Sequence, residues 1–245
     1  MQGMEAVVHL AAITNVPYSI SHPIMTNRVN VEGTVNLLNS ACKGRVSKFV
    51  NISSYAVYGE AKRLPTDEQH PKAPLSPYAA SKLCSEVYCG AFHEAYGLDT
   101  TSLRLFNVYG PRQEGDPYAG VIVQFKKRLM KGDPPVVYGY GNQTRDFVHV
   151  YDVVDAICKC LENTHVVGNV FNIGSGIATS ISELADLMIA LSQKDIRPVY
   201  SPPRQGDIMR SCADITRARA ELGYEPMISL ETGLKTVFHV TEKIA

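Results

Sequence analysis

A tyrosine and a lysine four residues apart, Tyr78 and Lys82, form the pattern with the clearest chemical potential. Ser76 and Pro77 precede them and predict a helix N-terminus, with serine as the N-cap and proline at the first helical position. Side chains four residues apart share one face of a helix. An ammonium group beside a phenol lowers the phenol pKa from its usual value of about 10, which gives a general base near neutral pH. An ordinary pair on a helix surface is the alternative.

Polar residues also follow two of the strands that the sequence predicts. Ser53 and Ser54 end a strand over 48–53, and Asn107 follows a strand over 101–106. Ligands bind at the carboxyl ends of the strands in open parallel sheets. The serine hydroxyls and the asparagine amide are therefore candidates for contact with a sugar or a phosphate. A serine pair that caps a turn and an asparagine within a turn are the alternatives.

The elements that carry these residues alternate along the first half of the chain. The apolar patterns predict strands over 6–10, 48–53 and 101–106, and helices over 24–42 and 77–96. Such alternation is typical of a parallel sheet with helices on both faces. Further on, the patterns predict helices over 121–131, 151–161, 181–191 and 214–222, and strands over 136–138, 147–150 and 169–173.

The composition excludes several classes of protein. The 245 residues hold 24 Lys and Arg against 24 Asp and Glu, so no basic surface for nucleic acid is expected. No apolar run is long enough for a membrane helix, and the first residues carry no basic signal region, so a cytoplasmic protein is expected. The six cysteines form no C-x-x-C pair, so we expect reduced thiols and no metal site.

Five motifs in order resemble the extended short-chain dehydrogenase/reductase family, and within it the nucleotide-sugar epimerase/dehydratase branch. The resemblance covers nearly the whole chain. The motifs are His9-Leu10-Ala11-Ala12, Asn30-Val31-Glu32-Gly33-Thr34, Ser54 with Tyr78 and Lys82, the run from Thr144 to Asp152, and Arg204-Gln205-Gly206-Asp207.

The resemblance implies NAD as the cofactor and a catalytic set of Ser54, Tyr78 and Lys82. Ser54 would hydrogen-bond the sugar oxygen that is oxidised, Tyr78 would take its proton, and Lys82 would hold the nicotinamide ribose. The other residues that the resemblance places at the cofactor are Leu10, Ala11, Ala12, Asn30, Ser53 and Phe106.

The resemblance also implies a UDP-sugar substrate and a site for it. Asn107, Arg145 and Arg204 would bind the diphosphate, a task that suits the two-pronged arginine side chain. The nucleotide site would be shaped by Val121, Tyr138 and Asp207. A homodimer through the helices at about 27–43 and 77–96 is expected by the same analogy.

The residues after Ser54 bear on which reaction this branch member performs. The resemblance implies that a nucleotide-sugar 4,6-dehydratase would carry an acidic pair directly after the catalytic serine. This chain has Tyr55 and Ala56 at those positions. An uncharged pair is similar to that of the UDP-sugar 4-epimerases, which predicts epimerisation at C4 through a 4-keto sugar. UDP-glucose and UDP-galactose are the expected substrates, and N-acetylated or uronic acid forms stay open. A dehydratase or decarboxylase is the alternative.

The family's opening glycine-rich turn is not found in the sequence. The chain begins at what resembles the fourth strand of a doubly wound sheet, so about 60 residues of such a fold are expected to be missing, two units of ~30 residues each. We therefore expect a truncated NAD-binding domain over 1–112, to which 146–174 returns, and a nucleotide-sugar lobe over 113–145 and 175–245. The expected consequences are impaired activity and an exposed strand edge at 6–10; a non-catalytic sugar-nucleotide-binding remnant is the alternative.

Overall fold

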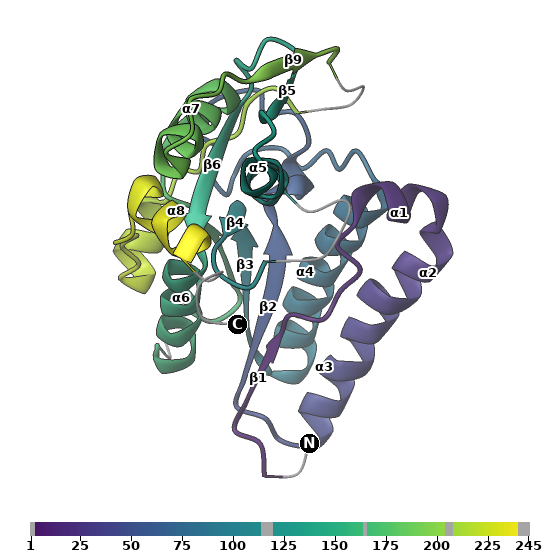
Figure 1. Cartoon of the computed structure of the whole chain (residues 1–245). Coiled ribbons are helices and arrows are strands. Elements are labelled where there is room, and N and C mark those ends of the chain that lie inside the picture. The colour runs from purple at the N-terminus through teal and green to yellow at the C-terminus, as the bar shows by residue number, and fades with distance from the viewer. Residues whose placement is uncertain (1–2, 114–119, 164–165, 204–207, 240–245) are drawn as a thin grey trace.

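The computed structural model describes residues 3–113, 120–163, 166–203 and 208–239. Its main sheet is parallel, with the strand order β1-β2-β3-β7 (Figure 1). The strands are β1 (Ala6–His9), β2 (Lys48–Ser54), β3 (Asp99–Leu105) and β7 (Asn169–Ile173). The parallel sheet that the alternation of elements predicts is therefore confirmed.

Helices cover both faces of this sheet (Figure 1). One face carries α3 (Gly33–Lys43) and α4 (Pro77–Tyr96), preceded by α1 (Val16–Ser21), α2 (Pro23–Asn27) and the π-helical segment η1 (Arg28–Glu32). The other face carries α6 (Val150–Glu162) and the π-helical segment η3 (Ala218–Leu222). No helix in the described ranges has the length and apolar character needed to cross a membrane.

Helix α4 has the bounds that the sequence predicts, because both of its ends are capped. The Ser76 side chain accepts a hydrogen bond from the amide of Ala79, and Pro77 occupies the first turn. Gly97 ends the helix in the left-handed conformation, with a φ of 68°. The helical segment predicted over 24–42 is confirmed by the run of α2, η1 and α3 over 23–43. The short helix α1 before it was not predicted; the Asn15 side chain caps it by accepting from the amide of Tyr18, and the non-helical His22 separates it from α2.

Two smaller sheets lie beside the main one. In the first, β6 (Thr144–His149) pairs in parallel with β4 (Asn107–Tyr109) and antiparallel with β8 (Ala178–Ser180). The second joins β5 (Val136–Tyr138) to β9 (Val199–Ser201). These sheets pack with α5 (Val121–Lys131), α7 (Ile181–Ser192) and α8 (Leu230–His239).

The sequence-based prediction of this second half needs correction. It omits the strands at 107–109, 178–180 and 199–201 and the helix at 230–239. Within 146–174, residues 146–149 lie in β6, which pairs with β4 and β8, whereas α6 packs against the main sheet and β7 belongs to it. The predicted division into two domains stays a prediction.

Strand β4 joins two of the apolar cores. Phe106, just before it, packs in the core between the main sheet and α6 together with Leu103 and Phe171. Tyr109, at its end, packs in the second core with Leu184. The segment 106–109 therefore lies where the two cores meet, at the carboxyl ends of the main strands.

A glycine fixes how the chain leaves this edge of the sheet. Gly59 ends the 3₁₀ turn η2 (Tyr55–Tyr58) with φ 66° and ψ −138°, and a Cβ there would lie 2.2 Å from the Ala73 carbonyl oxygen. We expect Gly59→Ala to lower the free energy of unfolding by about 3 kcal/mol or more, because it combines a glycine-only conformation with a backbone clash.

Gly97→Ala is the matched control for this prediction. Gly97 also has a positive φ, of 68°, but a Cβ added there would meet no atom within 4 Å. We expect a loss of about 1 kcal/mol. Denaturant unfolding of both variants measures the difference, and equal losses would contradict the role assigned to the Gly59–Ala73 contact.

Candidate active site

A pocket of about 470 Å³ lies at the carboxyl ends of β1, β2 and β3, next to the start of α4. It collects most of the residues that the sequence proposes for catalysis and for the cofactor. The proposed residues that line it are Leu10, Ser53, Ser54, Tyr78, Lys82, Phe106, Asn107 and Val121. This is the edge of a parallel sheet at which ligands bind in open α/β folds.

Tyr78 occupies the first turn of α4, where its amide donates a hydrogen bond to the Ser19 hydroxyl over 3.1 Å. Burial raises the pKa of the Tyr78 phenol, while its hydrogen bond with the Ser54 hydroxyl lowers it and the nearby Tyr55 raises it. The contact between Tyr78 and Ser54 confirms that the two proposed catalytic residues meet.

Lys82 is almost completely buried at the inner wall of the pocket. Its Nζ donates to the carbonyl oxygen of Ile52 over 2.7 Å. Burial lowers the pKa of Lys82 to about 8, against the effect of the Glu86 carboxylate, which raises it. The expectation that Lys82 brings the pKa of Tyr78 below its usual value is wrong for this structure, because burial outweighs the favourable contacts and the pKa is raised.

The two serines at the end of β2 have different partners. The Ser54 hydroxyl accepts from the amide of Ala56 over 3.2 Å and thereby caps the η2 turn. The alternative, in which the serine caps a turn, is therefore confirmed for Ser54. The same hydroxyl also contacts Tyr78. The Ser53 hydroxyl donates to the Glu86 carboxylate on α4. Ser54 is thus the serine that faces the phenol, and Ser53 ties the strand end to the helix.

One polar group in the pocket wall lacks a protein partner. The side-chain amide nitrogen of Asn107 is buried, and no hydrogen-bond acceptor for it occurs in the described part of the chain. Leaving a buried donor unpaired costs about 1–3 kcal/mol. A ligand oxygen would remove that cost, so Asn107 fits the proposed contact with a phosphate or sugar oxygen. Beside it, Tyr55 stacks on Phe106 with ring centroids 5.3 Å apart and makes a flat apolar wall.

The segment after β1 is tied down by Asn30. The Asn30 side chain accepts from the amide of Ile13 over 2.8 Å and donates to the Ile13 carbonyl and the Ser81 hydroxyl, each over 2.9 Å. The side-chain amide nitrogen and oxygen of Asn30 therefore both have hydrogen-bond partners within the protein. Ala11 and Ala12 lie in the held segment, outside the lining of the pocket. Cofactor contacts by Asn30, Ala11 and Ala12 stay predictions.

The remaining substrate residues do not join this pocket. Tyr138 lines a second pocket of about 210 Å³ together with Pro203 and Met209. Arg145 is buried on β6, where it donates to the Thr144 carbonyl over 2.8 Å, and it lines neither pocket. Arg204 and Asp207 lie outside the described residues.

Glu86 and Arg104 are not among the site residues that the sequence predicts. Glu86 follows Lys82 by one helical turn, and Arg104 stands in the interior of a buried strand. A charged residue at a buried position needs a partner. That requirement is the signal by which the pair could have been found.

Comparison with known proteins identifies the family of the chain. Residues 1–174 match the family model for the NAD dependent epimerase/dehydratase family. The UDP-glucose 4-epimerase of Mycolicibacterium smegmatis is 41% identical over 235 residues, which are 95% of this chain and 75% of that protein. The dTDP-glucose 4,6-dehydratase of Streptomyces griseus is 37% identical over 235 residues, which are 96% of this chain and 70% of that protein.

A solved structure is also similar. The crystal structure of UDP-glucose 4-epimerase from Thermotoga maritima with UDP-glucose superposes with a TM-score of 0.93 and 40% identity, covering 98% of this chain and 77% of that one. The match to the family extends over more than half of the chain, and both the sequence and the fold agree with it. The chain therefore belongs to the NAD-dependent epimerase/dehydratase family.

Proposed function

We propose that the chain carries the active site of an NAD-dependent 4-epimerase that acts on a UDP-sugar of the UDP-glucose/UDP-galactose type. One observation carries the proposal: Ser54, Tyr78 and Lys82 line one pocket in which the neighbouring Tyr55 and Ala56 are uncharged. Epimerisation at a carbinol carbon needs one proton acceptor and donor, and Tyr78 supplies a phenol for that purpose.

Tyr78 and Ser54 act at the sugar oxygen, and other residues of the pocket would hold the cofactor. NAD, when bound, would accept the hydride from C4 and give it back to the opposite face of that carbon, which inverts its configuration. Tyr78 takes the proton of the C4 hydroxyl as that oxygen becomes a carbonyl, and it returns the proton when the hydroxyl forms again. Ser54, already in contact with the phenol, hydrogen-bonds the same oxygen. Lys82, Ser53 and Phe106 are the residues that would hold the cofactor.

The substrate contacts extend this proposal outward from the pocket. Asn107 offers its unpaired amide to the diphosphate, and Val121 and Tyr138 would border the nucleotide. We assign the cofactor to the domain over 1–112 with its return in α6 and β7, and the nucleotide to the lobe over 113–145 and 175–245. We also propose a homodimer through α3 and α4, since Val87 on α4 is 64% exposed.

Two titrations and a product analysis test the function. Calorimetric titration of the chain with NAD+ and with UDP-glucose measures the two affinities separately, and NMR of the products identifies the reaction. Formation of UDP-galactose from UDP-glucose in the presence of NAD+, even at a low rate, would support the epimerase. A 4-keto-6-deoxy sugar would indicate a dehydratase instead. Binding of UDP-glucose with no turnover at saturating NAD+ would favour a sugar-nucleotide-binding protein.

Replacement of the proton acceptor tests the role of Tyr78. We expect Tyr78→Phe to lower kcat about a hundredfold or more and to leave the KM for UDP-glucose within a few-fold, because a phenyl ring keeps the packing but cannot transfer a proton. Steady-state kinetics of UDP-glucose epimerisation measures both constants. Tyr88→Phe is the matched control: Tyr88 lies on the same helix, is 40% exposed and lies outside the pocket lining. A Tyr78→Phe variant that keeps more than about a tenth of wild-type kcat would contradict the assignment.

The buried lysine predicts a stability that depends on pH. The pKa of Lys82 is about 8 in the folded chain, below its usual value of 10.5, so the unfolded chain binds more protons between these values. Stability of the wild type therefore rises as pH increases through that range. We expect Lys82→Met to be more stable than wild type at pH 7 by roughly 1–2 kcal/mol, since it removes the buried charge but leaves the Ile52 carbonyl unpaired.

The advantage of this variant should shrink by pH ~10, where the wild-type lysine is largely neutral. Denaturant unfolding at both pH values measures the change. Lys127→Met serves as the control, because Lys127 is exposed on α5. A stability difference for Lys82→Met that stays constant between the two pH values would show that the lysine is not buried as an ammonium.

A further inference from the structure

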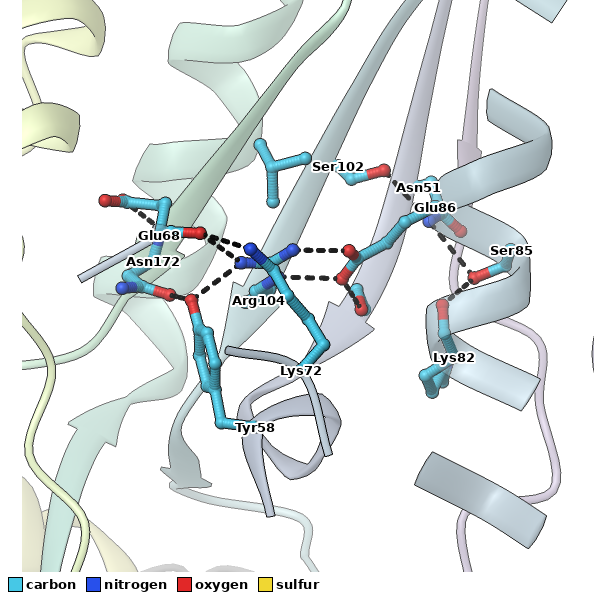
Figure 2. A network of polar contacts seen from close by, with 12 residues as sticks. Asn51, Tyr58, Glu68, Lys72, Lys82, Ser85, Glu86, Ser102, Arg104 and Asn172 are labelled. Atoms are coloured by element: carbon cyan, nitrogen blue, oxygen red, sulfur yellow. Dashed lines mark hydrogen bonds and ion pairs between the residues drawn. The ribbon is translucent and has the colours of Figure 1, made fainter. Parts of the chain in front are cut away.

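A buried ion pair lies directly behind the active-site pocket. Glu86 is one helical turn beyond Lys82 on α4, and Arg104 reaches it from β3 (Figure 2). Arg104 Nε donates to Glu86 Oε1 over 3.0 Å and Nη2 donates to Oε2 over 2.7 Å. The side chains are only 4% and 5% exposed. Both carboxylate oxygens are therefore held by one guanidinium group, which fixes the orientation of the carboxylate.

The ion pair is attached to the end of strand β2. Ser53 donates its hydroxyl proton to Glu86 Oε1, the oxygen that also accepts from Arg104 Nε. Ser53 and Arg104 are register partners in the parallel ladder between β2 and β3. Because Ser53 lines the pocket and precedes Ser54, the carboxylate holds α4 against the strand end that carries the proposed catalytic serine.

The other end of the guanidinium group holds the turn that follows Ser54. Arg104 Nη1 donates to the Tyr58 hydroxyl over 2.8 Å, and this hydroxyl donates to Asn172 Oδ1 over 2.6 Å. Arg104 Nη1 also donates to the Glu68 carbonyl over 3.2 Å. Figure 2 shows the guanidinium group between the Glu86 carboxylate on one side and Tyr58 and Glu68 on the other. Arg104 on β3 thus contacts α4 and the η2 turn directly. It is linked to β2 through the Ser53 bond to Glu86 and to β7 through the Tyr58 bond to Asn172.

We propose that Glu86 and Arg104 are positioning residues of the active site, which hold the Ser53–Ser54 strand end and the Lys82 turn of α4 in fixed relation. The proposal rests on the proposed function for the meaning of that site. A buried ion pair is often no more stabilising than apolar residues of similar size, so stability alone gives little reason for its presence here.

The carboxylate also acts on the charge of Lys82. The pKa of Lys82 is lowered by burial and raised by Glu86. Among the described residues, Tyr55, Tyr78 and Tyr109 line the same pocket as Lys82. His9 on β1 is also near, and its pKa is lowered by burial and then by Lys82. With Glu86 neutral, the Lys82 ammonium would lose its proton at a lower pH.

Direct titration of Lys82 by NMR tests the proposal without turnover. The full chain is labelled with ¹³C at lysine Cε, and the Lys82 signal is assigned by its loss in Lys82→Met. In Glu86→Gln we expect the pKa of Lys82 to fall by roughly half a pH unit or more. Since that variant leaves Arg104 buried without a counter-ion, Glu86→Gln/Arg104→Met provides a second variant with no unpaired charge. We expect a fall there too, smaller because loss of the Arg104 cation offsets part of the loss of the Glu86 anion.

An ion pair between β2 and β3, far from the pocket, is the matched control. Lys48 and Asp99 are register partners at the opposite ends of β2 and β3, with Nζ and Oδ2 3.4 Å apart. Asp99→Asn removes this pair and should leave the pKa of Lys82 unchanged. If Lys82 titrates as in wild type in a folded double variant, the proposal is wrong. It is also wrong if the double variant fails to fold while Asp99→Asn folds, because the pair would then serve stability.

The test separates this proposal from the proposed function. A wild-type chain without epimerase turnover would contradict the function but would leave the Lys82 titration unaffected. A chain that is active, with a Lys82 pKa unchanged in both Glu86 variants, would contradict the positioning role alone. Where turnover is measurable, the pH profile of kcat in Glu86→Gln should shift to lower pH on the limb that reports Lys82, which a purely structural role would not produce.

Discussion

The register of three parallel strands is the constraint on which the site depends. Ser53 on β2, Arg104 on β3 and Asn172 on β7 are neighbours across the ladder, so their side chains form one polar row beneath the carboxyl edge of the sheet. A shift of one residue in any strand would turn its polar side chain to the opposite face. The Glu86 carboxylate meets this row from α4 and thereby sets where Lys82 and Tyr78 stand.

A second buried carboxylate organises the smaller sheets in a similar way. Asp146 on β6 accepts from the amides of Ser175, Gly176 and Ala213 over 2.7, 3.0 and 3.0 Å. Burial raises the pKa of Asp146, and these hydrogen bonds oppose the rise. The carboxylate joins segments that are far apart in sequence, next to Arg145, the residue proposed for the diphosphate. Both halves of the chain therefore use a buried carboxylate to fix residues beside a proposed ligand site.

Local patterns predicted the main sheet and helix α4, because their signals lie within a few residues: the Ser76–Pro77 cap, the Gly97 stop and the apolar run of β2. The pocket around Ser54, Tyr78 and Asn107 followed from the rule that parallel strands end at one edge. The short strands β4, β8 and β9 carry too few residues for a pattern and are defined by their pairing partners. The direction of the Tyr78 pKa depends on burial, which the spacing to Lys82 does not report.

The directions in which the pKa values of Tyr78 and Lys82 are shifted indicate which of the two groups is charged near neutral pH. Burial raises the pKa of Tyr78 above its usual value and lowers that of Lys82 to about 8, so the proton stays on the phenol across the neutral range. Burial disfavours the charged form of each group, and in the protein alone no change of pH near neutrality yields a phenolate beside an ammonium. Positive charge brought by a ligand would lower the pKa of Tyr78 and make it a base only in the loaded pocket. The Glu86 side chain, which is 5% exposed and one turn behind Lys82, raises the pKa of Lys82 against the effect of burial.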